Sequence, residues 1–135
     1  MTPSSQPSAI DRLLAGIEAG SIEDDVFADD AALDATVPNW RFTIRGGTRV
    51  RDQLAQWYMD PGRFQALQRT FLGQDRELVE FTLTWTEEGV EHTCHQAHIV
   101  STTGDRVSTD TMFCGGRWPA DLVAQMNAAE ESTGS

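Results

Sequence analysis

The feature that most constrains the fold is a change of pattern along the chain, from helical spacing near the start to strand alternation near the end. Apolar residues recur at helical spacing over 9–19. Runs at 77–86, 90–100 and 106–114 alternate as strands do, and short turns containing glycine separate them. A meander of strands that follows helices must bury one sheet face against them. We therefore predict an α+β fold in which a curved, mostly antiparallel sheet of about six strands forms a cone-shaped half-barrel, with N-terminal helices closing a pocket.

The segment between these halves predicts shorter elements. The patterns indicate a helix, two strands and a second helix, in that order, at 22–27, 32–37, 40–45 and 48–58. Residues 64–72 are ambiguous, because the spacing of Phe64, Leu67 and Phe71 suits a helical turn while the last three residues could begin a strand.

We expect a single domain, since 135 residues are enough to bury a core. Residues 1–7 are rich in serine, proline and glutamine and are expected to be disordered. The domain should cover 8–127 and end in a short helix that carries Leu122 and Met126. Residues 128–135 are polar and are expected to form a flexible tail.

Composition excludes several classes of function. A net charge of −11 argues against nucleic acid and anionic membranes as partners. No apolar run approaches the ~20 residues of a membrane span, and the polar start lacks a secretion signal pattern, so we expect a cytoplasmic protein. The chain has no lysine, which excludes a lysine Schiff base and lysine-linked pyridoxal phosphate. No nucleotide motif is visible, and we expect no cofactor.

The cysteines and histidines do not predict a metal site. Cys94 and Cys114 are too few for a disulfide framework, and their spacing matches no zinc motif. His92 and His98 would lie about 20 Å apart along an extended strand, which is too far to share an ion. We expect no bound metal.

Two motifs carry a resemblance to a known superfamily. One is the phrase Phe-Ala-Asp-Asp-Ala-Ala-Leu at 27–33, and the other is Gly46 or Gly47 followed by Val50 and Leu54. With the order of elements, these motifs resemble the nuclear transport factor two-like superfamily, which includes ketosteroid isomerase, limonene epoxide hydrolase and the SnoaL-like polyketide cyclases. The resemblance implies a cystatin-type α+β fold with a pocket, and a homodimer through the convex sheet face. It implies no single function, because this scaffold hosts unrelated chemistries.

The catalytic residues of ketosteroid isomerase have no counterparts at the matching positions. Leu13 stands where that enzyme has its tyrosine, and Ala35 stands where it has its base. The place of its oxyanion acid falls at Ala97 or His98. The catalytic set of limonene epoxide hydrolase cannot be aligned either. The chain is therefore more similar to SnoaL-like proteins.

Strand alternation predicts which side chains share the pocket face. On the last two strands these are Gln96, His98, Asp110, Met112 and Cys114, and the resemblance implies that this face looks into the pocket. Phe81, Leu83 and Trp85 on the preceding strand and Trp40 would complete an apolar cup. Of Trp57 and Tyr58, which end the roofing helix, we expect one to join the core and the other to offer a ligand hydrogen bond, and we take Tyr58 as the ligand-binding residue.

His98 and Asp110 are the candidate catalytic residues. A carboxylate beside an imidazole orients it and raises its basicity, as general-base catalysis requires. We therefore expect cofactor-free acid/base chemistry on an apolar organic molecule, of the isomerase, cyclase, dehydratase or hydrolase type. Two alternatives stay open: a pocket that only binds or carries a hydrophobic small molecule, and a dimeric interaction module. For the homodimer, the convex face would present His95, Ile99 and Phe113.

Overall fold

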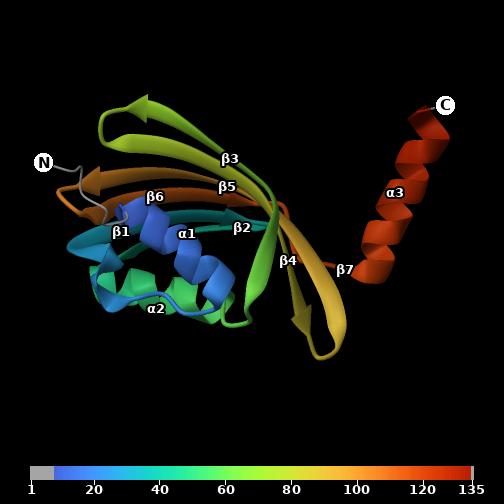
Figure 1. Ribbon diagram of the computed structural model, residues 1–135, viewed down its shortest axis with the longest axis horizontal. Coiled ribbons are helices and arrows are strands. Elements are labelled where there is room, and N and C mark those ends of the chain that lie inside the picture. Colours follow the sequence, from blue (N-terminus) through green and yellow to red (C-terminus); the bar gives the residue numbers. More distant parts are fainter. Residues whose placement is uncertain (1–7, 135) are drawn as a thin grey trace, which may run out of the picture.

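The computed structural model of the protein describes residues 8–134, without the side chains of 132–134 (Figure 1). In chain order the elements are α1 (Ala9–Ala19), the 3₁₀ helix η1 (Asp24–Val26), β1 (Phe27–Val37), β2 (Trp40–Arg45), α2 (Gly47–Trp57), β3 (Gly62–Gly73), β4 (Arg76–Glu87), β5 (Val90–Thr103), β6 (Arg106–Cys114), β7 (Trp118–Pro119) and α3 (Ala120–Gly134). Helices α1 and α2 lie against the sheet, whereas α3 projects away from it beyond β7.

All of these strands belong to one curved sheet. Its order is β2-β1-β6-β5-β4-β3, and β7 pairs with β5 off this path. Strands β1 and β6 run parallel, and the other pairs are antiparallel. The sheet does not close into a barrel, so it keeps a concave face, and α1 and α2 lie on that side (Figure 1). This confirms the predicted α+β fold with a curved, mostly antiparallel sheet.

Several elements differ from the sequence prediction. The helix expected at 22–27 is only the turn η1, because β1 begins at Phe27 and pairs with both β2 and β6. The ambiguous stretch 64–72 lies within β3, since pairing with β4 overrides the local helical spacing. Helix α3 continues to Gly134, whereas we expected the domain to end at residue 127 and a tail to follow. The alanine and glutamate residues of this stretch favour a helix. The expected disorder of 1–7 lies outside the described residues.

Helix α2 can approach the sheet because its first residue is glycine. A Cβ at Gly47 would lie 2.3 Å from the carbonyl oxygen of Ala28 on β1, a distance that backbone cannot accommodate. This contact seats α2 against β1, where Val50 and Leu54 are fully buried. The C-terminal end of α2 then brings Trp57 and Tyr58 over the concave face.

The register between β5 and β6 decides which side chains meet on that face. The two strands join through a two-residue turn, and an irregularity follows between Ser101 and Thr102. As a result Ile99 pairs with Thr111, and Thr102 pairs with Val107. Alternation still keeps one set of residues buried on the concave side: Gln96, His98, Val100, Asp110 and Met112.

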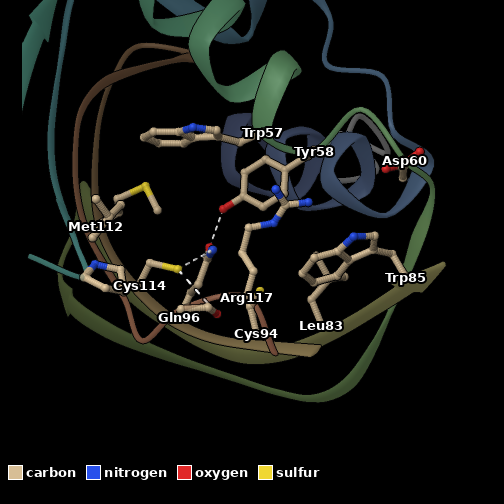
Figure 2. Close-up of a pocket in the computed structure, with 13 residues that line it drawn as sticks. Trp57, Tyr58, Asp60, Leu83, Trp85, Cys94, Gln96, Met112, Cys114 and Arg117 are labelled. Atoms are coloured by element: carbon tan, nitrogen blue, oxygen red, sulfur yellow. Dashed lines mark hydrogen bonds between the residues drawn. The ribbon is translucent and has the colours of Figure 1, made fainter. Parts of the chain in front are cut away.

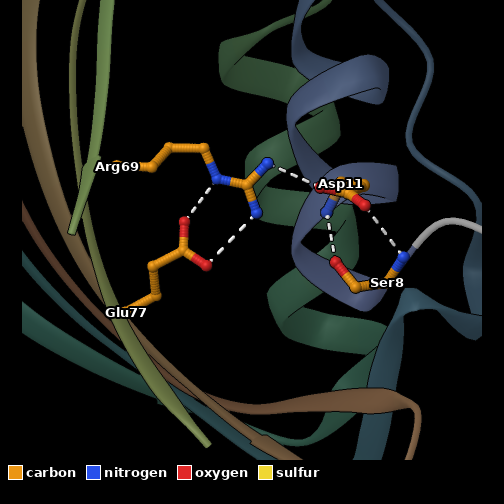
Figure 3. A network of polar contacts seen from close by, with 4 residues as sticks. All are labelled: Ser8, Asp11, Arg69 and Glu77. Carbon is orange, nitrogen blue, oxygen red and sulfur yellow. Dashed lines mark hydrogen bonds and ion pairs between the residues drawn. The ribbon is translucent and has the colours of Figure 1, made fainter. Parts of the chain in front are cut away.

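Arg69, which is 34% exposed, pairs with the buried Glu77 and with Asp11, and so ties the β3–β4 hairpin to α1 (Figure 3). The guanidinium of Arg69 makes a bidentate contact with Glu77, and its Nη1 donates to Asp11 at 2.6 Å. The Glu77 side chain is only 3% exposed. Asp11 also closes the capping box of α1 with Ser8. The Arg69 side chain, which bonds to it, holds the pKa of Asp11 below its usual value. Because Glu77 is buried with its charge, it depends on Arg69 for its partner.

Replacing Arg69 by methionine should therefore lower the free energy of unfolding by about 3 kcal/mol, since it leaves a buried carboxylate unpaired. Urea unfolding followed by tryptophan fluorescence measures this change. Arg76→Met, which removes an exposed arginine from the same hairpin, should cost less than about 0.5 kcal/mol. The double variant Arg69→Met/Glu77→Leu should recover most of the loss. Equal stabilities of the two single variants would contradict this role for Arg69.

Candidate functional site

A cavity of about 400 Å³ opens between the end of α2 and the concave faces of β4, β5 and β6 (Figure 2). Its walls are largely apolar, and polar side chains reach it at a few places. The lining residues are Val37, Pro38, Trp57, Tyr58, Asp60, Leu83, Trp85, Cys94, Gln96, Met112, Cys114, Gly116 and Arg117. A cavity of this size with few convergent polar groups is typical of a small-molecule site.

The principal polar group on the cavity wall is the pair formed by Tyr58 and Gln96. The Tyr58 hydroxyl donates a hydrogen bond to Gln96 Oε1, and the Gln96 amide donates to Cys114 Sγ at 3.3 Å. Burial raises the pKa of Tyr58 well above its ordinary value, and nearby acidic groups add to this effect. Tyr58 is therefore a neutral phenol over the physiological range and acts as a hydrogen-bond donor.

His98 and Asp110 lie directly behind this pair. His98 Nδ1 is 2.9 Å from both carboxylate oxygens of Asp110, and both side chains are almost completely buried. Phe81 stacks on the His98 ring, with centroids 5.5 Å apart. His98 Nε2 is 3.4 Å from the Tyr58 hydroxyl and 3.0 Å from Gln96 Oε1. A continuous polar chain thus runs from buried Asp110 through His98 to the cavity wall.

The hydrogen positions in this chain follow from the donors available. Because a carboxylate only accepts, Nδ1 of His98 carries the proton that is shared with Asp110. A neutral ring then leaves Nε2 as an acceptor, which the Tyr58 hydroxyl can reach. A doubly protonated ring instead donates from Nε2 to Gln96 Oε1. Tyr58 therefore has two acceptors, and the protonation of His98 decides between them.

A second polar cluster forms the Trp85 side of the cavity. The Arg117 Cζ lies 5.3 Å from the centre of the Trp85 ring, and the guanidinium pairs with Glu87. Trp85 Nε1 donates to the same Glu87 carboxylate at 3.2 Å. This bond, together with the charge of Arg117, keeps the pKa of Glu87 below its ordinary value. Gly116 has a φ of 128°, which glycine adopts readily, and the turn there directs Arg117 back to the cavity.

The predicted ligand-binding residues divide into two groups. Six of them line the cavity: Tyr58, Leu83, Trp85, Gln96, Met112 and Cys114. Phe81, His98 and Asp110 are not among the lining residues, and their contacts with Tyr58 and Gln96 place His98 and Asp110 behind that pair. The expectation that His98 and Asp110 reach into the cavity is thereby corrected.

Trp40 is a further correction, because it is 68% exposed and does not line the cavity. It has the same parity as Phe42 and Ile44, which pack against the core. It begins edge strand β2, however, beyond the part of the strand that is packed against the core. Alternation along a strand predicts the face of a side chain but not whether anything covers that face.

Arg117 and Asp60 are lining residues that the sequence analysis missed. Both lie in segments outside the predicted strands, where alternation carries no information. The Gly115-Gly116 pair before Arg117 was the available signal, because consecutive glycines permit a sharp return of the chain.

Comparison with known proteins identifies the fold. No family model and no curated protein matches the sequence. An NTF2-like protein from Anabaena variabilis superposes with a TM-score of 0.69 at 14% identity, over 86% of this chain and 95% of that one. A candidate isomerase from Rhodopseudomonas palustris gives a TM-score of 0.62 at 16% identity, over 98% and 100% of the two chains. The chain has the NTF2-like fold. This confirms, for the fold, the resemblance drawn from the sequence motifs.

The NTF2-like fold by itself assigns no activity to the chain. A candidate isomerase from Bacillus subtilis also superposes, with a TM-score of 0.63 at 13% identity over 79% of this chain and 86% of that one. Within the described residues, no three histidine, cysteine or acidic side chains cluster as metal ligands would. No helix in the same part of the chain has the length and apolar character needed to span a membrane.

The two cysteines should differ in reactivity. Both cysteines line the cavity, but burial raises the pKa of Cys94 to about 12, so it stays a thiol at pH 8, whereas Cys114 is only partly buried. We expect a thiol reagent such as DTNB at pH 8 to modify one cysteine per native chain and both in urea. Cys114→Ser should abolish the native reaction. Rapid reaction of both cysteines in the folded protein, or a reaction of the folded protein that survives Cys114→Ser, would contradict this assignment.

Tyr58 is the single tyrosine of the chain, so absorbance at 295 nm reports its ionisation alone. The native protein should show no tyrosinate at pH 10, where the unfolded chain is about half ionised. Because the folded state holds the proton more tightly, this contribution to stability is intact below pH 10 and is lost as the pH rises above it. Tyr58→Phe should remove that alkaline loss. Half-ionisation of the native protein at pH 10 would be the contrary result.

Proposed function

We propose that this protein binds an apolar organic molecule in the cavity and acts on it by proton transfer, without a cofactor. The reaction would be of the isomerase, cyclase, dehydratase or hydrolase type. One observation carries the proposal: the Tyr58–Gln96 pair on the wall of an apolar cavity is backed by a buried, hydrogen-bonded His98–Asp110 pair. Convergent polar groups in an apolar cavity are the usual form of a small-molecule active site.

In this proposal Tyr58 is the group that meets the ligand. Its neutral hydroxyl would donate a hydrogen bond to a carbonyl or hydroxyl oxygen and stabilise negative charge that develops there. His98 would act through Tyr58, because it is not among the residues that line the cavity. When His98 is doubly protonated, its Nε2–H would return a proton to a Tyr58 oxygen that has given its own to the ligand, and His98 would become the neutral Nδ1–H ring that Asp110 orients. His98 and Asp110 are thus positioning residues.

A carrier without catalysis is the second candidate. It is favoured by the complete hydrogen bonding of the polar chain, in which no buried side-chain nitrogen or oxygen of the described residues lacks a partner. Networks of this kind also occur where their role is structural. Binding would then depend on the apolar walls, chiefly Trp57, Leu83 and Met112.

We also propose that the protein is a homodimer through the convex face of the sheet. Phe113 is 48% exposed on that face, and a shallow apolar depression beside it is lined by Ala97 and Trp118. The His95 ring forms hydrogen bonds with the side chains of Glu80 and Thr82 on the same face. A dimer would cover the exposed phenylalanine.

The test is a ligand-observed NMR screen of steroid-like, terpene-like and aromatic polyketide-like fragments, with each hit then assayed for turnover. We expect Tyr58→Phe to keep binding within a few fold and to lower turnover by about 100-fold or more. Asp110→Asn should lower turnover less than Tyr58→Phe does. It should also shift the pH profile of turnover, because Asp110 acts through His98. Leu67→Met, at an exposed position of β3 that does not line the cavity, is the control and should keep turnover.

The outcomes separate the two functions. Hits that wild type converts and Tyr58→Phe does not would support the enzyme. Hits that neither protein converts would favour the carrier. The absence of any hit would refute a ligand-binding cavity.

A further inference from the structure

We propose that the ligand carries an acidic group and that Arg117 binds it, so that Arg117 determines specificity for an apolar carboxylic acid. This inference rests on the proposed function for the existence of a ligand, and it adds the ligand's chemical class. Arg117 is the single cationic side chain among the described residues that line the cavity. Figure 2 shows it beside Trp85 among the lining residues, and its side chain is 53% exposed.

The guanidinium is held in place before any ligand arrives. Its Cζ lies over the Trp85 ring, and Nη2 pairs with Glu87, whose carboxylate also accepts a hydrogen bond from Trp85 Nε1. An arginine anchored by an aromatic face and one carboxylate loses little further freedom when it binds a second anion. Glu87 and Trp85 therefore act as positioning residues for Arg117.

The same contacts leave part of the guanidinium available. Among the residues that the structure describes, Glu87 is the only hydrogen-bond partner of Arg117, and it uses Nη2. The Nε–H and Nη1–H groups therefore remain as donors, and a guanidinium edge is shaped to hold a carboxylate. Because the residue also lines the cavity, these donors can meet a carboxylate whose apolar body lies against Leu83 and Trp57.

Asp60 presents the competing possibility, since its carboxylate also lines the cavity and could attract an amine. It has no hydrogen-bond or ion-pair partner among the described residues, so nothing orients it. A carboxylate that no neighbour orients must lose side-chain freedom when it binds a ligand, and this loss weakens its discrimination. The net charge of −11 repels anions at long range, so recognition of an acid must come from close contact with Arg117.

The test compares three probes that share one ring system: 2-naphthoic acid, 2-acetylnaphthalene and 2-(aminomethyl)naphthalene. Calorimetric titration of wild type should give an affinity for the acid about tenfold or more above that for the ketone. Arg117→Met should remove this preference and leave ketone binding unchanged. Arg117→Lys should retain part of the preference for the acid, because lysine keeps the positive charge but lacks the two parallel N–H donors of the guanidinium.

Arg49→Met is the matched control. It removes the same charge from an exposed arginine on α2 that does not line the cavity, so it should keep the preference for the acid. A thermal unfolding scan of each variant confirms that the fold is intact.

Each outcome bears on one proposal or the other. Equal binding of acid and ketone to wild type, or a preference that survives Arg117→Met, would overturn the role of Arg117 and leave the ligand cavity standing. Tighter binding of the amine would overturn it in favour of Asp60. If no naphthalene binds and the fragment screen is also empty, the ligand cavity itself is refuted.

Discussion

The pairing of β5 with its neighbours is the constraint on which the site depends. Strand β5 pairs with β4 along one edge and with β6 and then β7 along the other. Alternation along it aims Cys94, Gln96 and His98 at the concave face. The register with β6 sets His98 opposite Met112 and Val100 opposite Asp110, so the imidazole and the carboxylate meet diagonally at 2.9 Å. A register shift of one residue would turn all of these side chains outward.

The concave face buries two carboxylates, and each is paired in a different way. Glu77 accepts a bidentate contact from Arg69, an always-charged group that links the hairpin to the start of α1. Asp110 instead bonds to His98, a group that can gain or lose a proton. Burying either charge costs free energy that only a close partner offsets. The first pair can therefore serve only to hold the structure, whereas the second can also move a proton toward Tyr58.

The cavity combines an apolar body with two separate polar clusters. One is the Tyr58–Gln96 pair, which continues inward to His98, and the other is Arg117 held by Trp85 and Glu87. The clusters come from different parts of the chain: the end of α2 with β5, and the turn after β6 with the β4–β5 hairpin. Solved structures with the NTF2-like fold share only 13–16% identity with this chain in the cases compared, so these side chains and not the fold must decide the chemistry.

The sequence alone determined the order of elements, the curved α+β sheet and the inward face of β4, β5 and β6, because helical and strand periodicities are local properties of a chain. It also brought His98 and Asp110 onto one face. Only the tertiary structure decided depth: His98 and Phe81 lie behind the cavity wall, and Trp40 lies beyond the core that packs against its strand. It alone placed Arg117 and Asp60, since they lie outside the predicted strands, in segments whose path depends on contacts far away in the sequence. Periodicity specifies the direction of a side chain, whereas its burial depends on what packs over it.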